Sequence, residues 1–268
     1  MPAAGFQGGI FDVDGVLVDS PHERAWRDAL RELMDNDWAD IRDRIGWSAE
    51  GFTPQVYQQV MSGKPRMAGA LAGLEYFKVP DARDRVQTYA DRKQALLIRL
   101  IDAGEFKAYP DALRFVLAVR AAGIPVAAAS SSKNAGRFLG KIRLDTFAES
   151  EGLAYDFLRP GESLLEFFDA DLSGRDFAHG KPDPEIFLTA AAELGVAPEQ
   201  SFVVEDAESG VQAAKAARMA ALGVARADDE DLLAGAHADL VVTSLDEVDV
   251  AGLATHTLAR RSSGRTRG

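Results

Sequence analysis

Short apolar segments of the strand type alternate with helical segments through most of the second half of the chain. The strand-like segments span residues 124–129, 201–205, 220–224 and 239–242, and helical patterns occupy 112–122, 184–194 and 209–217. A further apolar run, residues 8–11, lies close to the start of the chain, whereas 145–180 show no clear pattern. Because a helix between two buried strands indicates a βαβ unit, the chain is predicted to form an α/β fold with a parallel sheet and helices on both faces.

Residues 21–107 contain helical patterns and no strand-like alternation. Apolar residues recur at helical spacing from Ala25 to Met34, and the clearest later helices span 56–61, 67–77 and 83–101. We therefore expect a helical domain, residues 21–107, inserted into an α/β core that comprises residues 1–20 and 108–259. The basic tail, residues 260–268, is rich in Ser and Gly and is predicted to be disordered.

The composition excludes several classes of protein. The 268 residues carry a net charge of −12, which argues against partners such as nucleic acid or an anionic membrane surface. Cysteine is absent, so disulfides and thiolate metal sites are excluded. Neither a signal peptide nor an apolar run of the roughly 20 residues that span a bilayer is evident. We expect a cytoplasmic protein, a monomer or a weak homo-oligomer.

Two aspartates follow the first strand-like run. Asp12 and Asp14 are separated by one residue and precede Gly15. Carboxylates at the carboxyl end of a buried strand lie where open α/β sheets bind their ligands. Asp-x-Asp-Gly is also a turn signature, so this motif alone leaves a turn and a functional site equally open.

Three later segments carry polar side chains at comparable positions. Ser130 and Ser131 end the strand-like run 124–129, where free amides and hydroxyls favour an anion site, although plain helix capping is the alternative. Lys181 lies between Gly180 and Pro182, and the alternative for it is a surface lysine in a turn. Carboxylates also end the strand 201–205, at Glu205 and Asp206. Together with Asp12 and Asp14, these carboxylates form an oxygen-only set that suits Mg²⁺.

The order of these motifs resembles the haloacid dehalogenase superfamily across nearly the whole chain. The Asp12–Gly15 segment matches its first motif, Ser130 or Ser131 the second, Lys181 the third, and Glu205-Asp206 the fourth. The resemblance implies a Rossmann-like core with a helical cap and a Mg²⁺-dependent aspartyl-phosphate mechanism. It further implies that Asp12 is the nucleophile and Asp14 the general acid and base. The implied metal ligands are Asp12, the Asp14 backbone carbonyl and Asp206, with Glu205 nearby.

Within that superfamily the chain resembles the β-phosphoglucomutase-like subfamily. The resemblance implies that His22, Arg66 and Lys93 face the substrate, with Arg66 on a phosphate. It also implies that Ser132-Lys133-Asn134 hold a second, non-transferring phosphate. The alternative for His22, Arg66 and Lys93 is a solvated helical face. The chain departs from the family's pattern in a connection 19–22 that is two residues short and in a long segment 149–180.

The resemblance implies a mutase that interconverts hexose 1- and 6-phosphates. The alternative is a phosphatase of sugar phosphates or other small molecules with the same core. A dehalogenase is disfavoured because Asp14 would have no role with a halide leaving group, and the same residue argues against a phosphonate hydrolase. A non-catalytic phosphate-binding module is also disfavoured, since no motif carboxylate is lost.

Overall fold

The structure is a computed structural model that describes residues 5–45, 47–62 and 64–262. It divides into two compact units: an α/β unit, formed by the chain up to Ser20 and from Lys107 onward, and a helical unit, Pro21–Phe106. Lys107, which the sequence pattern assigned to the helical domain, pairs with Asp19 and belongs to the α/β unit.

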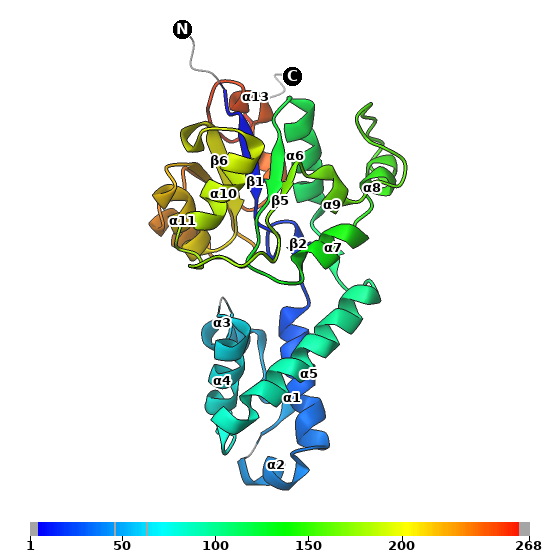
Figure 1. Ribbon diagram of the computed structural model, residues 1–268, viewed down its shortest axis with the longest axis vertical. Coiled ribbons are helices and arrows are strands. Elements are labelled where there is room, and N and C mark those ends of the chain that lie inside the picture. Colours follow the sequence, from blue (N-terminus) through cyan, green and yellow to red (C-terminus); the bar gives the residue numbers. More distant parts are fainter. Residues whose placement is uncertain (1–4, 46, 63, 263–268) are drawn as a thin grey trace, which may run out of the picture. The chain divides into compact units, whose positions relative to one another are not determined.

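The α/β unit is built on one parallel sheet with the strand order β5-β4-β1-β6-β7-β8 (Figure 1). Its strands are β1 (Gly8–Phe11), β4 (Val126–Ala128), β5 (Ala170–Asp171), β6 (Ser201–Glu205), β7 (Ala220–Val224) and β8 (Leu240–Val242). The central strand, β1, is buried along its whole length between β4 and β6. The predicted fold class is therefore confirmed.

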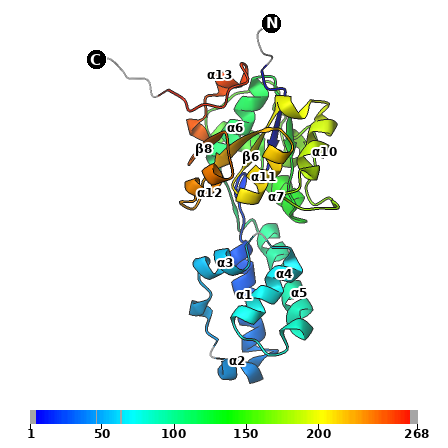
Figure 2. The ribbon, with the colours of Figure 1, turned by 90° about the vertical axis from the view of Figure 1, so that its left-hand side faces the viewer.

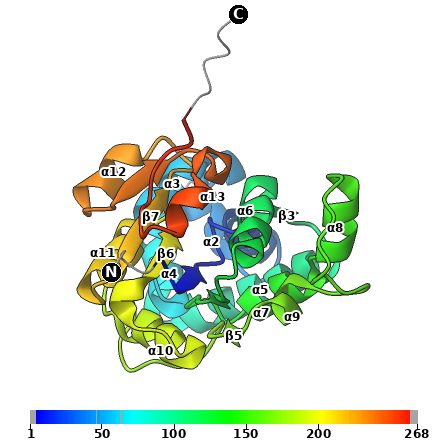
Figure 3. The same ribbon diagram turned by 90° about the horizontal axis from the view of Figure 1, so that it is seen from above.

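Helices cover both faces of this sheet, as Figure 3 shows from above. One face carries α10 (Glu185–Leu194), α11 (Glu208–Ala216) and α12 (Glu230–Gly235), and the other carries α6 (Pro110–Ala121) and α13 (Val250–Leu253). Successive strand residues point to opposite faces. Ile10 accordingly packs in the core cluster under α10 and α11, whereas the ring of Phe11 lies 6.0 Å from that of Phe115 in α6.

Residues 145–180, which show no clear sequence pattern, contain the edge strand β5 of the sheet. Helices α7 (Ala135–Lys141), α8 (Leu144–Ser150) and α9 (Leu164–Phe167) precede β5, which pairs with β4 at the sheet edge. Asp169 anchors this edge, because its carboxylate accepts hydrogen bonds from Arg120 and from the Val126 amide. A strand of only two residues leaves no periodicity, so the sequence could not predict it.

A two-stranded antiparallel ribbon lies where the chain leaves the α/β unit and returns to it. Its strands are β2 (Val18–Asp19) and β3 (Lys107–Ala108), with Val18 opposite Ala108. The sequence analysis did not predict this ribbon.

The helical unit consists of packed helices, seen in Figure 2. They are α1 (His22–Asp35), α2 (Ala39–Ile45), α3 (Pro54–Val60), α4 (Arg66–Tyr76) and α5 (Ala82–Asp102), with a short 3₁₀ turn, η1 (Ala49–Gly51), before α3. Helix α5 packs on α1 and α4. Tyr89 of α5 is fully buried and donates its hydroxyl to the Trp26 carbonyl of α1 at 3.0 Å. No helix within the described ranges is both long enough and apolar enough to span a membrane.

The prediction of disorder is wrong for the first residues of the tail. The Arg260 side chain donates to the Val241 carbonyl at 2.8 Å and pairs with Glu247, and the Arg261 amide donates to the Glu247 carbonyl at 2.6 Å. These contacts tie the start of the tail to the α/β unit. Residues 263–268, which share the prediction, lie outside the described residues.

Asp111, the second residue of α6, is buried and binds the C-terminal part of the chain. Its carboxylate accepts hydrogen bonds from the Leu245 amide at 2.8 Å and from Arg226 at 2.9 Å. Burial alone would raise the pKa of Asp111, but the hydrogen bonds from Arg226 and Leu245 outweigh it and lower the pKa below the ordinary 3.8.

Asp111→Asn is expected to cost about 2 kcal/mol of unfolding free energy at pH 7, because it removes charge-assisted hydrogen bonds. The pKa of Asp111 is lower in the folded than in the unfolded protein. The carboxylate therefore stabilises the fold fully at pH values above its unfolded pKa, and this stabilisation is lost as the pH falls through its folded pKa. Urea unfolding at pH 7 and at pH 3 should therefore show a difference that shrinks in acid. The exposed Asp246→Asn is the control, and an equal loss in both variants would contradict the prediction.

Candidate active site at the carboxyl ends of three strands

The parallel register brings the predicted core motifs to one edge of the sheet. Phe11 lies opposite Ala128 of β4 and Val204 of β6, so the residues that follow these strands leave the sheet side by side. Asp12 follows β1 directly, and its amide donates to the Val204 carbonyl at 3.0 Å. Ser130 follows β4 by two residues, and Glu205-Asp206 end β6.

Lys181 lies just before α10 and points into this edge. Its Nζ is 2.6 Å from Asp12 Oδ1 and also pairs with Glu205, although 169 and 24 residues separate these partners in sequence. Phe187 of α10 is fully buried, and its ring centroid lies 4.8 Å from Lys181 Nζ. The lysine is therefore held between two carboxylates and an aromatic ring, and it is not the surface side chain of the alternative interpretation.

Glu205 is a buried carboxylate, 1% exposed, whose two oxygens both have partners. One oxygen pairs with Lys181, and the other accepts hydrogen bonds from the Asp206 and Ala207 amides at 3.1 and 3.2 Å, just before α11. Gly210 makes room for this arrangement, because a Cβ at that position would overlap the Glu205 carboxylate. The absence of a side chain at position 210 thus serves the site itself.

Gly210→Ala is expected to destabilise the fold by about 1–3 kcal/mol, as overpacking of a well-filled site does. The displaced Glu205 would also leave Lys181, so turnover should fall together with stability. Thermal unfolding and a rate assay on the same preparation test both effects. Gly136→Ala is the control, since a Cβ on Gly136 would meet nothing within 4 Å, and similar behaviour of the two variants would refute the prediction.

The turn after Asp14 brings the backbone against Asp206. Gly15 has a positive φ of 87°, and a Cβ there would overlap the Asp206 carboxylate. The Gly15 amide donates to the Val18 carbonyl at 2.8 Å, which closes the turn. The turn that the Asp-x-Asp-Gly motif predicts is therefore present, and it packs against Asp206, one of the predicted site carboxylates.

Several carboxylates lie close together at this edge, and burial and mutual repulsion shift the pKa values of two of them. Burial, with the charges of Glu205 and Asp14, raises the pKa of Asp12 to about 7 even though Lys181 opposes the shift. Burial, with the charges of Glu205 and Asp12, also raises the pKa of Asp206 well above its ordinary value. Burial lowers the pKa of Lys181, but the two paired carboxylates outweigh it and raise the pKa overall. The lysine is thus cationic, and Asp12 and Asp206 hold a proton more tightly than isolated carboxylates do.

A divalent cation fits this set of donors. Carboxylate oxygens of Asp12, Glu205 and Asp206 lie within 4.8 Å of one another. Because both Glu205 oxygens already have partners, Asp12 and Asp206 are the better-placed ligands. Oxygen donors of this kind suit Mg²⁺, and its charge would favour the ionised form of both carboxylates against the burial and mutual repulsion that raise their pKa values.

The segment after β4 is stabilised by its own serines. Ser130 Oγ accepts from the Ser132 amide at 3.0 Å, and Ser132 Oγ accepts from the Asn134 amide at 3.3 Å. Lys133 Nζ contacts the Gly174 carbonyl at 2.8 Å and Asp176 at 2.5 Å. Ser131 and Lys133 line, with Lys181, a cavity of about 170 Å³. The Ser130 and Ser132 hydroxyls thus hold backbone amides of the segment before α7, whose N-cap Asn134 has no side-chain cap hydrogen bond, and Lys133 is ion-paired.

The predicted substrate residues of the helical unit have different environments. Lys93 is only 4% exposed; its Nζ lies 2.9 Å from His22 Nδ1 and 4.9 Å from the Trp26 ring centroid. A solvated helical face is therefore the wrong interpretation for Lys93. Arg66, the first residue of α4, is exposed. The functions assigned to these residues remain predictions.

Arg226 is a residue of this sheet edge that the sequence analysis missed. It follows β7 by two residues, and its guanidinium donates to the Gly15 and Val16 carbonyls of the turn after Asp14. A charged residue just beyond a buried strand is the same signal that marked Glu205 and Asp206.

Comparison with known proteins identifies the class to which this site belongs. The family model described as "Hydrolase: haloacid dehalogenase-like hydrolase" matches residues 8–218. The chain belongs to the haloacid dehalogenase superfamily and is an enzyme of that superfamily. The superfamily that was predicted from the motifs is therefore confirmed.

Relatives at modest identity define the subfamily. The chain is 32% identical to a β-phosphoglucomutase of Mycobacterium bovis over 89% of this chain and 90% of that protein. It is 31% identical to a fructose-1-phosphate phosphatase of Escherichia coli, over 82% and 96% of the two chains. A crystal structure of an archaeal β-phosphoglucomutase from Pyrococcus superposes with a TM-score of 0.64 at 29% identity, covering 92% and 96%. The predicted β-phosphoglucomutase-like subfamily is thereby confirmed.

Proposed function

We propose that the protein is a Mg²⁺-dependent phosphoryl-transfer enzyme that acts on sugar phosphates through a phosphoaspartate at Asp12. The observation that carries the proposal is the 2.6 Å contact between Asp12 and Lys181, beside the Asp206 carboxylate. A carboxylate can attack an anionic phosphoryl group only where cations neutralise the accumulated charge. The substrate class is supported by relatives that are named β-phosphoglucomutase and fructose-1-phosphate phosphatase.

Each core residue has one task in this proposal. Asp12 forms the bond to phosphorus, which divides the transfer into two easier steps. Lys181 holds the attacking carboxylate and neutralises the phosphoryl oxygens, and Ser130 and Ser131 donate to those oxygens. Asp14 protonates the leaving oxygen and then deprotonates the entering hydroxyl. Mg²⁺, held by Asp12, Asp206 and the Asp14 backbone carbonyl with Glu205 beside them, would neutralise charge on the transferring group.

The leading reaction is interconversion of hexose 1- and 6-phosphates. A mutase must hold a second phosphate while the bisphosphate intermediate turns round, whereas a phosphatase holds one. Arg66 and the segment Ser132-Lys133-Asn134 are the proposed second-phosphate ligands, since arginine binds phosphate in a bidentate way. His22 and Lys93 are the proposed sugar-facing residues. From the sequence alone, the protein is proposed to be cytoplasmic and to be a monomer or a weak homo-oligomer.

A sugar phosphatase is the second candidate, and one observation favours it. Lys133, a proposed ligand of the second phosphate, is instead paired with Asp176 and the Gly174 carbonyl. A second phosphate would have to displace that ion pair. A sugar phosphatase needs only the groups around Asp12.

Phosphorus NMR separates the two candidates in one experiment. The protein is incubated with Mg²⁺ and a hexose 1-phosphate, with and without a catalytic amount of the hexose 1,6-bisphosphate. Appearance of the 6-phosphate, stimulated by the bisphosphate, supports the mutase. Inorganic phosphate as the dominant product supports the phosphatase, and no turnover of any sugar phosphate with Mg²⁺ would overturn both.

Asp14→Ala is expected to reduce turnover by about 10²–10⁴-fold, the range that a positioned acid and base contributes. Its proposed metal ligand is the backbone carbonyl, so Mg²⁺ affinity should change much less than the rate. Isothermal titration with Mg²⁺ beside steady-state kinetics tests this separation. Loss of Mg²⁺ binding in proportion to the rate would show that the carboxylate acts mainly on the metal.

A further inference from the structure

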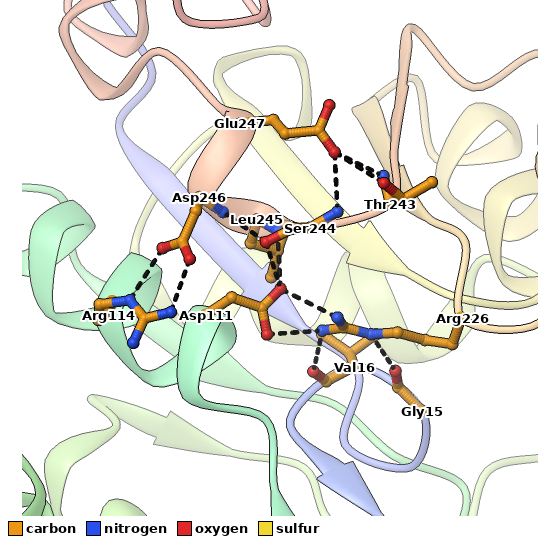
Figure 4. A network of polar contacts seen from close by, with 10 residues as sticks. All are labelled: Gly15, Val16, Asp111, Arg114, Arg226, Thr243, Ser244, Leu245, Asp246 and Glu247. Carbon is orange, nitrogen blue, oxygen red and sulfur yellow. Dashed lines mark hydrogen bonds and ion pairs between the residues drawn. The ribbon is translucent and has the colours of Figure 1, made fainter.

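Figure 4 shows a polar network that includes Arg226 and Asp111. Arg226 follows β7 at the same end of the sheet at which Asp12 follows β1 and Asp206 follows β6. β7 pairs with β6 in parallel, with Gly223 opposite Glu205, so the residues after both strands emerge together. Arg226 Nε donates to the Gly15 carbonyl and Nη2 to the Val16 carbonyl, each at 3.3 Å. One guanidinium therefore bridges two successive carbonyls of the turn that follows Asp14.

Contacts with two further side chains fix the orientation of the Arg226 guanidinium. Asp111 accepts from Nη1 at 2.9 Å and from Nη2 at 3.3 Å, and the ring of Tyr109 lies 3.9 Å from the guanidinium carbon. The side chains of Arg226 and Asp111 are only 15% and 9% exposed. A partly desolvated, bidentate pair of this kind holds the planar donor fork in one orientation.

Asp111 does not depend on Arg226 for its own position. Its carboxylate also accepts from the Leu245 amide at 2.8 Å and from Ser244 Oγ at 3.2 Å, as Figure 4 shows. The arginine is thus attached to a carboxylate that is anchored from α6 and from the C-terminal part of the chain.

The turn is restrained on two sides. Asp206 packs against Gly15 so closely that no Cβ would fit, and Arg226 holds the carbonyls of Gly15 and Val16. Asp14 lies directly before these peptides, so a shift of the turn moves its carboxylate and its carbonyl. We infer that Arg226 is a positioning residue, whose guanidinium fixes the turn 14–16 and thereby places Asp14 for proton transfer. The catalytic part of this inference rests on the proposed function.

Arg226→Met tests the inference, with Arg114→Met as the matched control. Arg114 makes a similar bidentate pair with Asp246, at 2.9 and 2.6 Å, and binds Glu151 at 2.6 Å. Among the described residues, its hydrogen bonds reach no part of the turn. Both variants lose one arginine and one bidentate ion pair, and only Arg226→Met releases the turn carbonyls.

The first measurement is amide hydrogen exchange, which requires no turnover. The Gly15 amide donates to the Val18 carbonyl, and the amides of Leu17 and Val18 donate to the Val13 carbonyl, so these three bonds close the turn. We expect these amides to exchange about 10-fold faster or more in Arg226→Met, as loss of a hydrogen bond to a charged group implies. The amides of β6 should stay protected, and Arg114→Met should match the wild type at the turn. Equal exchange at the turn in both variants would overturn the inference.

The second measurement is steady-state hydrolysis of p-nitrophenyl phosphate with Mg²⁺. Misplacement of Asp14 should lower kcat by about 10²-fold, with KM within threefold of wild type, whereas Arg114→Met should change neither. Arg226→Lys keeps the charge without the planar fork and should resemble Arg226→Met; wild-type kcat in Arg226→Lys would overturn the positioning role. If the wild type turns over neither p-nitrophenyl phosphate nor any sugar phosphate, the proposed function fails, and hydrogen exchange still decides whether Arg226 holds the turn.

Discussion

Asp12→Asn is expected to reduce turnover of every phosphorylated substrate by about 10⁴-fold or more, because an amide cannot form the covalent bond to phosphorus. The substitution preserves shape, and the amide oxygen can still accept the hydrogen bond from Lys181 that the carboxylate accepts at 2.6 Å. It also removes one negative charge from an edge where burial, with the charges of Glu205 and Asp14, raises the pKa of Asp12 to about 7. The unfolding free energy of the variant should therefore equal or exceed that of the wild type.

Two measurements check this expectation. Steady-state kinetics gives the loss of rate, and intact-mass spectrometry after rapid quenching gives the phosphorylated enzyme, which should be absent in Asp12→Asn. Asp171→Asn is the control, since Asp171 also ends a parallel strand but binds the Ser173 amide at 2.8 Å instead of Lys181. If Asp12→Asn still accumulated phosphoenzyme, another residue would be the nucleophile.

Lys181→Met is expected to reduce both activity and stability. Removing one partner of a buried ion pair costs about 3–5 kcal/mol, and here one cation serves two carboxylates, Asp12 and Glu205, whose side chains are 10% and 2% exposed. Loss of the charge that faces the phosphoryl group should lower turnover by about 10²–10³-fold. Chemical unfolding without divalent cations gives the first quantity, and kinetics with Mg²⁺ gives the second.

The pH dependence of the Lys181→Met variant has a definite sign. Without the lysine, the pKa of Asp12 should rise further above the about 7 of the wild type, because burial and Glu205 act unopposed. A carboxyl group with a raised folded pKa stabilises the fold only while it is protonated, and the effect is lost as pH rises through the folded pKa. The destabilisation should thus be larger at pH 9 than at pH 5. Lys133→Met, which removes an exposed ion pair with Asp176, should cost less than about 1 kcal/mol at both values. Equal stability of the two variants would exclude the proposed role of Lys181.

The parts of the fold that were predictable have strong local signals. Strands β6 and β7 occupy the predicted residues, because continuous apolar runs bounded by polar residues specify buried parallel strands. Helix α5 also lies within one residue of its predicted range. The two-residue strands β2, β3 and β5 were missed, since their pairing partners, and not their own composition, define them.

The candidate site, like the fold, has features that the sequence predicted and features that it could not predict. Asp12 and Glu205 were chosen by type and by position at the ends of predicted strands, and Lys181 by its position just before a predicted helix. The structure brings their side chains into contact. The ion pair of Lys133 with Asp176 was not predictable, because it depends on how residues 173–181 fold back against the start of α7. The burial of Lys93 beside His22 likewise depends on the packing of α5 against α1.

By itself, the sequence determined the α/β fold class, the superfamily and the carboxylates and lysine of the core motifs. The fold class depends on local periodicity, whereas the superfamily and the core residues follow from the resemblance of the ordered motifs to that superfamily. The tertiary structure alone decided which oxygens of Glu205 are engaged, why position 210 must be glycine, and that Arg226 holds the turn after Asp14. Those facts depend on contacts between residues far apart in the chain, and their distances are set only when the sheet register and helix packing are complete.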